Sequence, residues 1–293
     1  MAAEQLAQYL ASGVVVGGIY ALIGLGFVIV FGVTRIVNFA QGEFVMLGAL
    51  GMAALGSQGM MPLAAFAVSV LGVAAVGALL YRLAVHPLRH APALAVLILT
   101  IGASIAIRGA ALIAWGTDPL AVPAFSAGPP IVVAGAVVVR QGIWVLAVAA
   151  AAFVALWWFF TRTYAGAAVQ ACALNPRAAR LMGIRVERVA LLAWALAGAL
   201  GATAGAVIAP ITYATYDMGL ILGLKGFVAA VLGGLVSPPA AIAGGFLLGV
   251  VESLAAGLVS SAYKDAVAFV VLVVVCLAQV LGALPWRVVA EET

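Results

Sequence analysis

The chain has 293 residues, of which 67% are hydrophobic and only 8% are charged, whereas soluble domains carry about 25% charged residues. This composition excludes an ordinary soluble domain and predicts an integral membrane protein with many spans. The net charge of +4 does not indicate a nucleic-acid partner, because the basic residues stand in short stretches between apolar runs, as the positive-inside rule expects.

The apolar runs predict an all-α polytopic membrane protein, a single transmembrane domain over residues 1–293 with eight or nine spans. The run at about 10–32 is expected to be a permanent span, because the start of the chain lacks the basic region of a cleavable signal peptide. The run at 43–56 is short, and is either a packed short span or a broken helix that lines a cavity. The other predicted spans are 62–82, 92–115, 142–160, 189–211, 219–236, 239–258 and 265–284.

The distribution of Lys and Arg predicts the orientation. The basic stretches 82–90 and 161–188 are expected on the cytoplasmic side, and 116–141, whose basic residue is Arg140, on the external side. Nine crossings then place the N-terminus outside and the C-terminus inside. If 43–56 re-enters instead of crossing, the N-terminus is inside.

Polar residues between the first two runs form the densest set near the membrane interior. Asn38, Gln41 and Glu43 are close together in the chain. They fit a cytoplasmic turn, in which Asn38 or Gln41 caps a helix and Glu43 complements its dipole. They also fit a broken segment that lines a translocation path, since polar residues inside lipid are costly and usually functional.

Four further charged residues lie within or near predicted spans: Arg108, Asp217, Lys225 and Glu252. Each either snorkels to the membrane interface or faces a pathway. Snorkelling suits Arg108, because Trp115 is nearby, and Lys225 and Glu252 are expected to pair because they are on adjacent spans.

Glycines at small-residue spacing predict close helix packing. Four G-x-x-x-G pairs occur in the apolar runs: Gly13/Gly17, Gly201/Gly205, Gly219/Gly223 and Gly245/Gly249. Such pairs let helix backbones approach closely in lipid. A short similarity between 42–48 and 226–233 hints at two related halves, as many transporters have.

The stretch 161–189 carries five of the thirteen Lys and Arg residues. Within it, Asn175 and Pro176 are suited to begin a helix and Gly183 to end it. A loop that only orients the protein would not need these caps. The short helix is therefore expected to dock on a cytoplasmic partner, with Leu181 and Met182 at the centre of the contact and arginines at its rim.

Catalytic chemistry is not expected of this chain, so we do not expect an enzyme. Neither Lys225 nor Lys264 lies in a phosphate-binding loop, and no nucleophile–base pair stands out. His86 and His90 are not expected to hold a metal, because Pro87 interrupts the helix they would share and no acidic residue is near. The function is expected to be passage through the membrane.

Several stretches together resemble the permeases of branched-chain amino acid ABC importers, and most closely the smaller of the two permease types. The resemblance covers most of the chain and is carried by 18–26, 31–33, 36–48, 171–183, 224–235 and 244–252. The chain departs from the family at Gln41, where His is common, and at Gln170, where a basic residue is frequent.

The resemblance implies a bacterial inner-membrane complex with a second permease, two cytoplasmic ATPase subunits and a periplasmic binding protein. No cofactor is expected on this chain, because ATP and Mg would bind the ATPases. The loop 161–188 would hold the coupling helix, with contacts from Asn175, Arg177, Ala179, Arg180, Leu181, Met182 and Gly183. The translocation path is expected at Asn38, Gln41, Glu43, Lys225 and Glu252.

Branched-chain amino acids are the expected substrates. Relatives that import urea, amides, aromatic acids or other organic acids remain an alternative. A stand-alone secondary transporter or channel, and a membrane scaffold or receptor without transport, are alternatives of a different class.

Overall fold

Eleven α-helices and one small hairpin form the parts of the chain that the computed structural model describes, residues 2–89, 91–126, 128–133, 135–235, 237–258 and 260–281. The α-helices are α1 (Ala2–Thr34), α2 (Gln41–Ser57), α3 (Pro62–Leu80), α4 (Ala93–Trp115), α5 (Arg140–Arg162), α6 (Tyr164–Leu174), α7 (Pro176–Leu181), α8 (Val186–Thr212), α9 (Met218–Leu232), α10 (Pro238–Leu258) and α11 (Lys264–Val280). Strands β1 (Ile131–Val133) and β2 (Ala136–Val138) pair antiparallel, and short π- and 3-10 turns extend α3 over 81–88.

Six of these helices are long and apolar enough to cross a bilayer, which confirms the all-α polytopic fold. They are α1 from Glu4, α3 with its extension to Leu88, α4, α5, α8 and α10. Three other predicted spans correspond to the shorter helices α2, α9 and α11, of 17, 15 and 17 residues. Part of the last predicted span, 265–284, lies outside the described residues.

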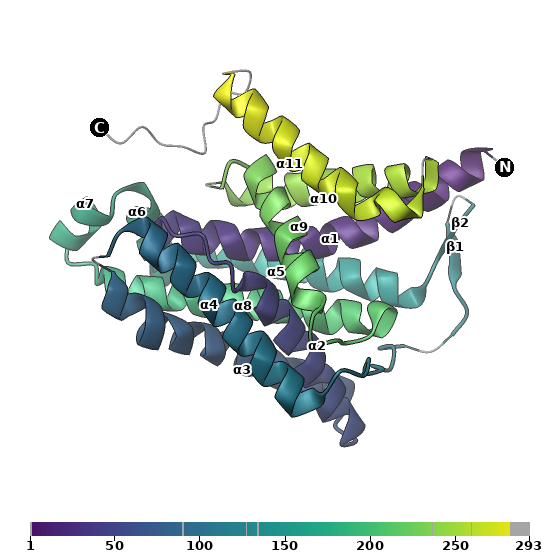
Figure 1. Ribbon diagram of the computed structural model, residues 1–293, viewed down its shortest axis with the longest axis horizontal. Coiled ribbons are helices and arrows are strands. Elements are labelled where there is room, and N and C mark those ends of the chain that lie inside the picture. Colours follow the sequence, from purple (N-terminus) through teal and green to yellow (C-terminus); the bar gives the residue numbers. More distant parts are fainter. Residues whose placement is uncertain are drawn as a thin grey trace.

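The long helices run roughly along the longest axis of the molecule (Figure 1). The N-terminal end of α1 and the β1–β2 hairpin are at one end, and α6 and α7 are at the other (Figure 1). The stretch 116–141, which we expected on the external side, contains that hairpin and the start of α5. Gln8 of α1 holds it by bonds from Nε2 to Val137 O (3.1 Å) and from Val137 N to Oε1 (2.7 Å).

The G-x-x-x-G pairs are helix contacts, as predicted. On α1, a Cβ at Gly13 would be 2.7 Å from Val250 Cα, and a Cβ at Gly17 would be 2.8 Å from Phe246 Cα. Gly245 and Gly249 of α10 face the backbone of α1 in return. The two remaining pairs pack on α2, with Gly201 and Gly205 on α8 and Gly219 and Gly223 on α9.

Two crossings are broken because their helices begin inside the bundle. Residues 35–40 are not helical, and Gln41 at the start of α2 bonds the carbonyl of Ala197. Ala197 lies eleven residues after the start of α8, about 16 Å along its axis. After the C-terminal end of α8, residues 213–217 are also not helical, and α9 begins where Gly219 meets Gly42.

For 43–56 the sequence leaves open a packed short span or a broken helix, and the packing of α2 supports the broken helix. An extended segment enters the bundle, and α2 then continues beside α8, where Gly48 packs on Ala202. Next, α3 returns along α8, since Gly77 packs on Trp194. Residues 35–57 thus pass through the bundle as a broken crossing, partly extended and partly helical.

Glycine packing between α1 and α10 gives a direct test of the fold. In Gly249→Ala the new methyl group would meet the Gly17 and Gly13 backbone, so we expect a loss of about 1–3 kcal/mol of stability and a lower thermal unfolding temperature in detergent. Gly72→Ala on α3 is the matched control, because a Cβ there meets nothing within 4 Å. Equal unfolding temperatures for the two variants would contradict the packing.

Candidate functional site

A buried carboxylate and an arginine form the first polar site. Glu43, in the first turn of α2, is 1% exposed and accepts hydrogen bonds at Oε1 from Arg108 Nη2 (2.8 Å) and Ser104 Oγ (2.7 Å). Its second oxygen, Oε2, has no hydrogen-bond partner among the described residues. The snorkelling prediction for Arg108 is wrong, since its guanidinium turns to Glu43 and its side chain is 24% exposed.

The other two polar residues of this segment hold the break in the helix. Asn38 Oδ1 accepts from Ala40 N (3.0 Å), and Thr100 Oγ1 of α4 accepts from Phe39 N (3.3 Å). Gln41 does not cap α2, because its Nε2 donates to Ala197 O (3.0 Å). Neither predicted cap of α2 forms, since the N-cap is Ala40 without a side-chain bond.

A cavity of about 230 Å³ adjoins Glu43 and Arg108. It lies among α1, α2, α4 and α9, and its walls combine the two charged groups and Ser104 with three phenylalanines, Phe27, Phe39 and Phe227. The Phe227 ring is 5.5 Å from that of Phe27 and 5.8 Å from that of Phe39. Gly42, Gly219 and Gly223 line the remaining side, where α2 and α9 meet.

A second charged cluster confirms the expected pairing of Lys225 with Glu252. Lys225 Nζ is 2.8 Å from Glu252 Oε1 and 2.6 Å from Asp265 Oδ1, and Tyr20 donates to Glu252 Oε2 (2.8 Å). Lys264 Nζ is 3.4 Å from Glu252 Oε1. This cluster joins α1, α9, α10 and α11 and bonds both Glu252 oxygens, so its charges are closed on one another.

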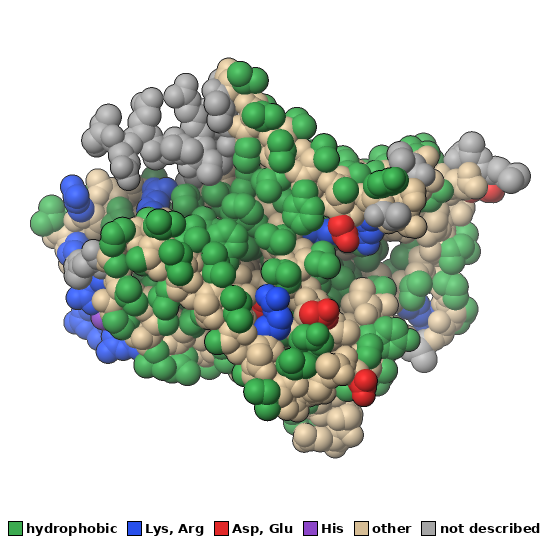
Figure 2. Space-filling model, in the orientation of Figure 1, with side chains coloured by type: hydrophobic (Ala, Val, Ile, Leu, Met, Phe, Trp, Pro, Cys, Tyr) green, Lys and Arg blue, Asp and Glu red, His purple; other side chains and the backbone are tan. Residues whose placement is uncertain are grey.

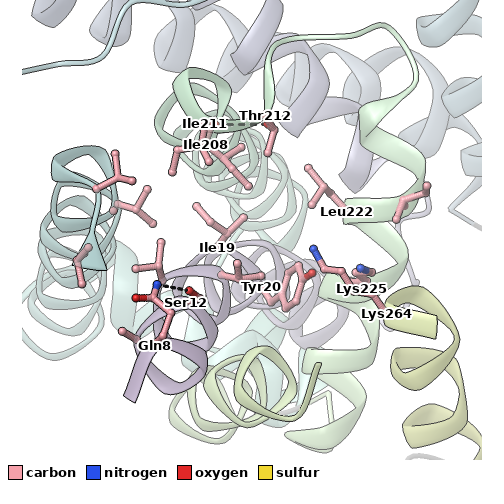
Figure 3. Close-up of a pocket in the computed structure, with 18 of the residues that line it drawn as sticks. Gln8, Ser12, Ile19, Tyr20, Ile208, Ile211, Thr212, Leu222, Lys225 and Lys264 are labelled. Atoms are coloured by element: carbon pink, nitrogen blue, oxygen red, sulfur yellow. Dashed lines mark hydrogen bonds between the residues drawn. The ribbon is translucent and has the colours of Figure 1, made fainter. Parts of the chain in front are cut away.

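A larger cavity, of about 440 Å³, lies beside this cluster (Figure 3). Tyr20, Lys225 and Lys264 stand on one side, and Gln8 and Ser12 on another (Figure 3). Between them the walls are apolar, with residues such as Ile19, Ile208 and Leu222. It lies toward the end of the bundle that carries the hairpin, because β2 lines it.

The short helix predicted after Asn175 exists as α7, with the caps that the sequence indicated. Asn175 Oδ1 accepts from Arg177 N and Ala178 N, both at 3.0 Å, and Gly183 has φ +84°. Leu181 and Met182 are 89% and 83% exposed. Ala179 instead is buried in the chain's own core, so its side chain is a packing residue of the loop.

The preceding part of the loop forms a helix that we did not predict, α6. Thr163 caps it by accepting from Gly166 N (3.0 Å), and Arg35 donates to the Ala173 carbonyl near its end (2.8 Å). Cys172 is a buried residue of α6, and this burial raises the pKa of its thiol. The loop is therefore packed on the bundle and tied to the broken segment 35–40.

Sequence reasoning missed several partners in both clusters. Ser104 and Arg108 join Glu43 from α4, and the spacing of four residues that puts them on one helix face was a usable signal. Tyr20, Lys264 and Asp265 join Lys225 and Glu252 from α1 and from the start of α11. No local pattern reveals Tyr20, because it reaches Glu252 across 232 residues.

A helical membrane bundle with broken crossings, interior ion pairs and cavities is an arrangement that membrane transport proteins use. The family of branched-chain amino acid transport system permease components matches residues 9–276. The chain therefore belongs to this family and is the permease subunit of an ABC importer.

Similar proteins cover nearly the whole chain. The high-affinity branched-chain amino acid transport system permease protein BraD of Pseudomonas aeruginosa is 35% identical over 292 residues, with 94% of this chain and 95% of BraD covered. LivH of Escherichia coli, named as the same kind of permease, is 33% identical over 294 residues, with 94% of each chain covered. A probable LivH of Methanocaldococcus jannaschii is 28% identical and covers 87% of this chain and 82% of its own.

A solved structure shares the fold. PsaBC from Streptococcus pneumoniae, in complex with Fab, superposes with a TM-score of 0.51 at 16% identity and covers 92% of this chain and 90% of its own. At this identity the likeness concerns the arrangement of the helices alone.

The Lys225–Glu252 pair is buried, at 3% and 1% exposed, so removing one partner should be costly. We expect Lys225→Met to lose about 3 kcal/mol of stability, because it leaves Glu252 charged and short of a cation. The double variant with Glu252→Gln should recover most of that loss. Thermal unfolding of the purified protein measures both.

The matched control is Lys264→Met, because the Lys264 side chain is 47% exposed and its Nζ is 3.4 Å from Glu252 Oε1. It should change stability by less than about 1 kcal/mol. Equal losses of stability in Lys225→Met and in the double variant would show that charge pairing does not stabilise this cluster.

Proposed function

We propose that this chain is a pore-forming subunit of an ATP-driven importer for branched-chain amino acids. The observation that carries the proposal is the family match over residues 9–276, joined by relatives named for branched-chain amino acid transport that cover 94% of the chain. The same permease family with urea, amides, or aromatic or other organic acids as cargo is the alternative for the substrate.

The orientation we propose places α6 and α7 in the cytoplasm of a cell whose inner membrane holds the bundle. Basic side chains gather at this end of the molecule, while the middle of the face is largely hydrophobic (Figure 2). This asymmetry is what the positive-inside rule expects of a cytoplasmic end. The N-terminal end of α1 is at the opposite, periplasmic end, and α11 runs back toward the cytoplasmic end (Figure 1).

The partners we propose are a second homologous permease, two cytoplasmic ATPases that bind ATP and Mg, and a periplasmic binding protein. The face around the smaller cavity suits the second permease. There Arg108 is partly exposed well inside α4, and a charge at that depth is costly against lipid. A second subunit would cover this charge and enclose a path along the cavity that Glu43 lines.

The ATPase contact we propose is α7. Its exposed apolar residues, Leu181 and Met182, stand beside Arg177 and Arg180, a hydrophobic centre with a basic rim. Asn175 and Gly183 fix the helix ends, so the contact is presented in one conformation. Ala179 supports this surface from beneath rather than touching the ATPase.

Replacing an exposed apolar residue of α7 with an acid tests this contact. We expect Met182→Asp to reduce ATPase copurification and ATP-driven leucine uptake at least about tenfold, because a charge would enter a desolvated contact. The matched control is Met61→Asp, since Met61 is 75% exposed in the α2–α3 connection. Copurification should be unchanged in this control.

Copurification and uptake that both survive Met182→Asp would overturn the docking proposal. Leucine uptake by this chain alone, driven by an ion gradient without ATPases, would instead support a secondary transporter. Uptake of an amide or an aromatic acid, but no amino acid, by the full complex would change the substrate assignment.

A further inference from the structure

We propose that the cavity of about 230 Å³ between α2 and α9 binds the amino acid itself, as a zwitterion with an apolar side chain. This inference rests on the proposed import function and adds a recognition site to it. Glu43 would hold the substrate ammonium, Arg108 its carboxylate, and the three phenylalanines its side chain.

The incomplete bonding of Glu43 is the first argument. Its carboxylate is 1% exposed, lines the cavity, and uses Oε1 for the bonds to Arg108 and Ser104. Oε2 has no hydrogen-bond partner among the described residues, and leaving a buried polar oxygen unbonded is unfavourable. An ammonium group bound there would satisfy this oxygen.

The guanidinium of Arg108 can also donate further hydrogen bonds. Its bonds to Glu43 and Ser104 come from Nε and Nη2, so Nη1 has no hydrogen-bond partner among the residues that the structure describes. A carboxylate is the anion whose geometry suits a guanidinium. The site therefore offers one acceptor and one cationic donor a few ångströms apart, as the two ends of an α-amino acid require.

The helix ends complement the charge of Glu43. Both α2 and α9 begin at this cavity, where Gly42 and Gly219 pack together. Helix N-termini carry partial positive charge and stabilise anions, so they complement the carboxylate of Glu43 in the first turn of α2. The absence of side chains at Gly42 and Gly219 lets the two helix ends touch beside this carboxylate.

The remaining walls fit an apolar side chain of modest size. Phe27, Phe39 and Phe227 stand together with Leu220 and Leu224. Pockets for drug-sized molecules are about 300–1,000 Å³, so a cavity of about 230 Å³ suits a smaller ligand. Ile105 and Leu220, 64% and 46% exposed, mark the side on which the cavity opens.

The larger cavity beside Lys225 lacks these features. Both oxygens of Glu252 are bonded, Oε1 to Lys225 and Oε2 to Tyr20, so neither is left without a partner as Oε2 of Glu43 is. A zwitterion would have to break those bonds before it could bind. We therefore assign the substrate to the Glu43 cavity.

The test is ligand binding to the purified permease–ATPase complex in nanodiscs, without the binding protein. L-Leucine should bind and raise the unfolding temperature. 4-Methyl-2-oxopentanoate, which lacks the ammonium, and leucinamide, which lacks the carboxylate, should each bind about 10- to 100-fold more weakly. No binding of leucine, or equal binding of either analogue, would overturn the proposal, and this arm needs no variant to fold.

Variants that remove one charge each then locate the site. Glu43→Gln and Arg108→Gln should each weaken leucine binding about 10- to 100-fold. Asp217→Asn is the matched control, because it also removes a charge, at an exposed position next to the start of α9 that does not line the cavity. It should bind leucine as the wild type does. Unchanged binding in folded Glu43→Gln would place the substrate elsewhere.

Uptake separates failure of the site from failure of the function. The wild-type complex with its binding protein should take up leucine when ATP is supplied. If it does so while Glu43→Gln and Arg108→Gln also transport and bind leucine normally, the site assignment is wrong and the import function stands. If the wild type transports no amino acid, the proposed function itself is wrong.

Discussion

Backbone groups that leave a helix inside a bilayer must find partners within the protein, and this constraint governs the fold. The chain leaves the helical conformation at 35–40 and at 213–217, and each interruption is bonded or enclosed. Asn38 and Thr100 take the N–H groups of Ala40 and Phe39, and Leu120 pairs with Ala214 by two 2.9 Å bonds. Enclosing these segments requires helices to approach closely, which the glycines on α8 and α9 permit.

Charged groups inside the bundle also need partners within the protein, and the two charged clusters differ in how fully they are bonded. Around Lys225 the charges close on one another and connect four helices, and both Glu252 oxygens are bonded. Around Glu43 one carboxylate oxygen has no hydrogen-bond partner in the part of the chain that the structure describes, and the residue lines a cavity. In a low-dielectric interior that difference is large, because an unsatisfied oxygen favours a cationic ligand and a satisfied one does not.

The sequence predicted much of the fold because lipid restricts the choices. Charge-free runs located the spans, and capping residues located both ends of α7, since each is a local pattern. Prediction from the sequence failed where the partner of a residue comes from a distant helix. Arg108 was expected at the interface beside Trp115, but Glu43, 65 residues earlier, holds it. Ala179 was expected on the docking surface, but packing against the bundle buries it.

The contacts also connect the loop with the interior. Arg35 bonds the Ala173 carbonyl at the end of α6, two residues before the cap of α7. From Arg35 the extended segment leads through Asn38 to Glu43 at the start of α2. A short, bonded stretch therefore joins α7 to the Glu43 cavity, whereas a flexible loop would absorb displacement. Under the proposed function, an ATPase that moves α7 would act on α6, on Arg35 and on the broken crossing, which supplies Phe39, Gly42 and Glu43 to the cavity wall.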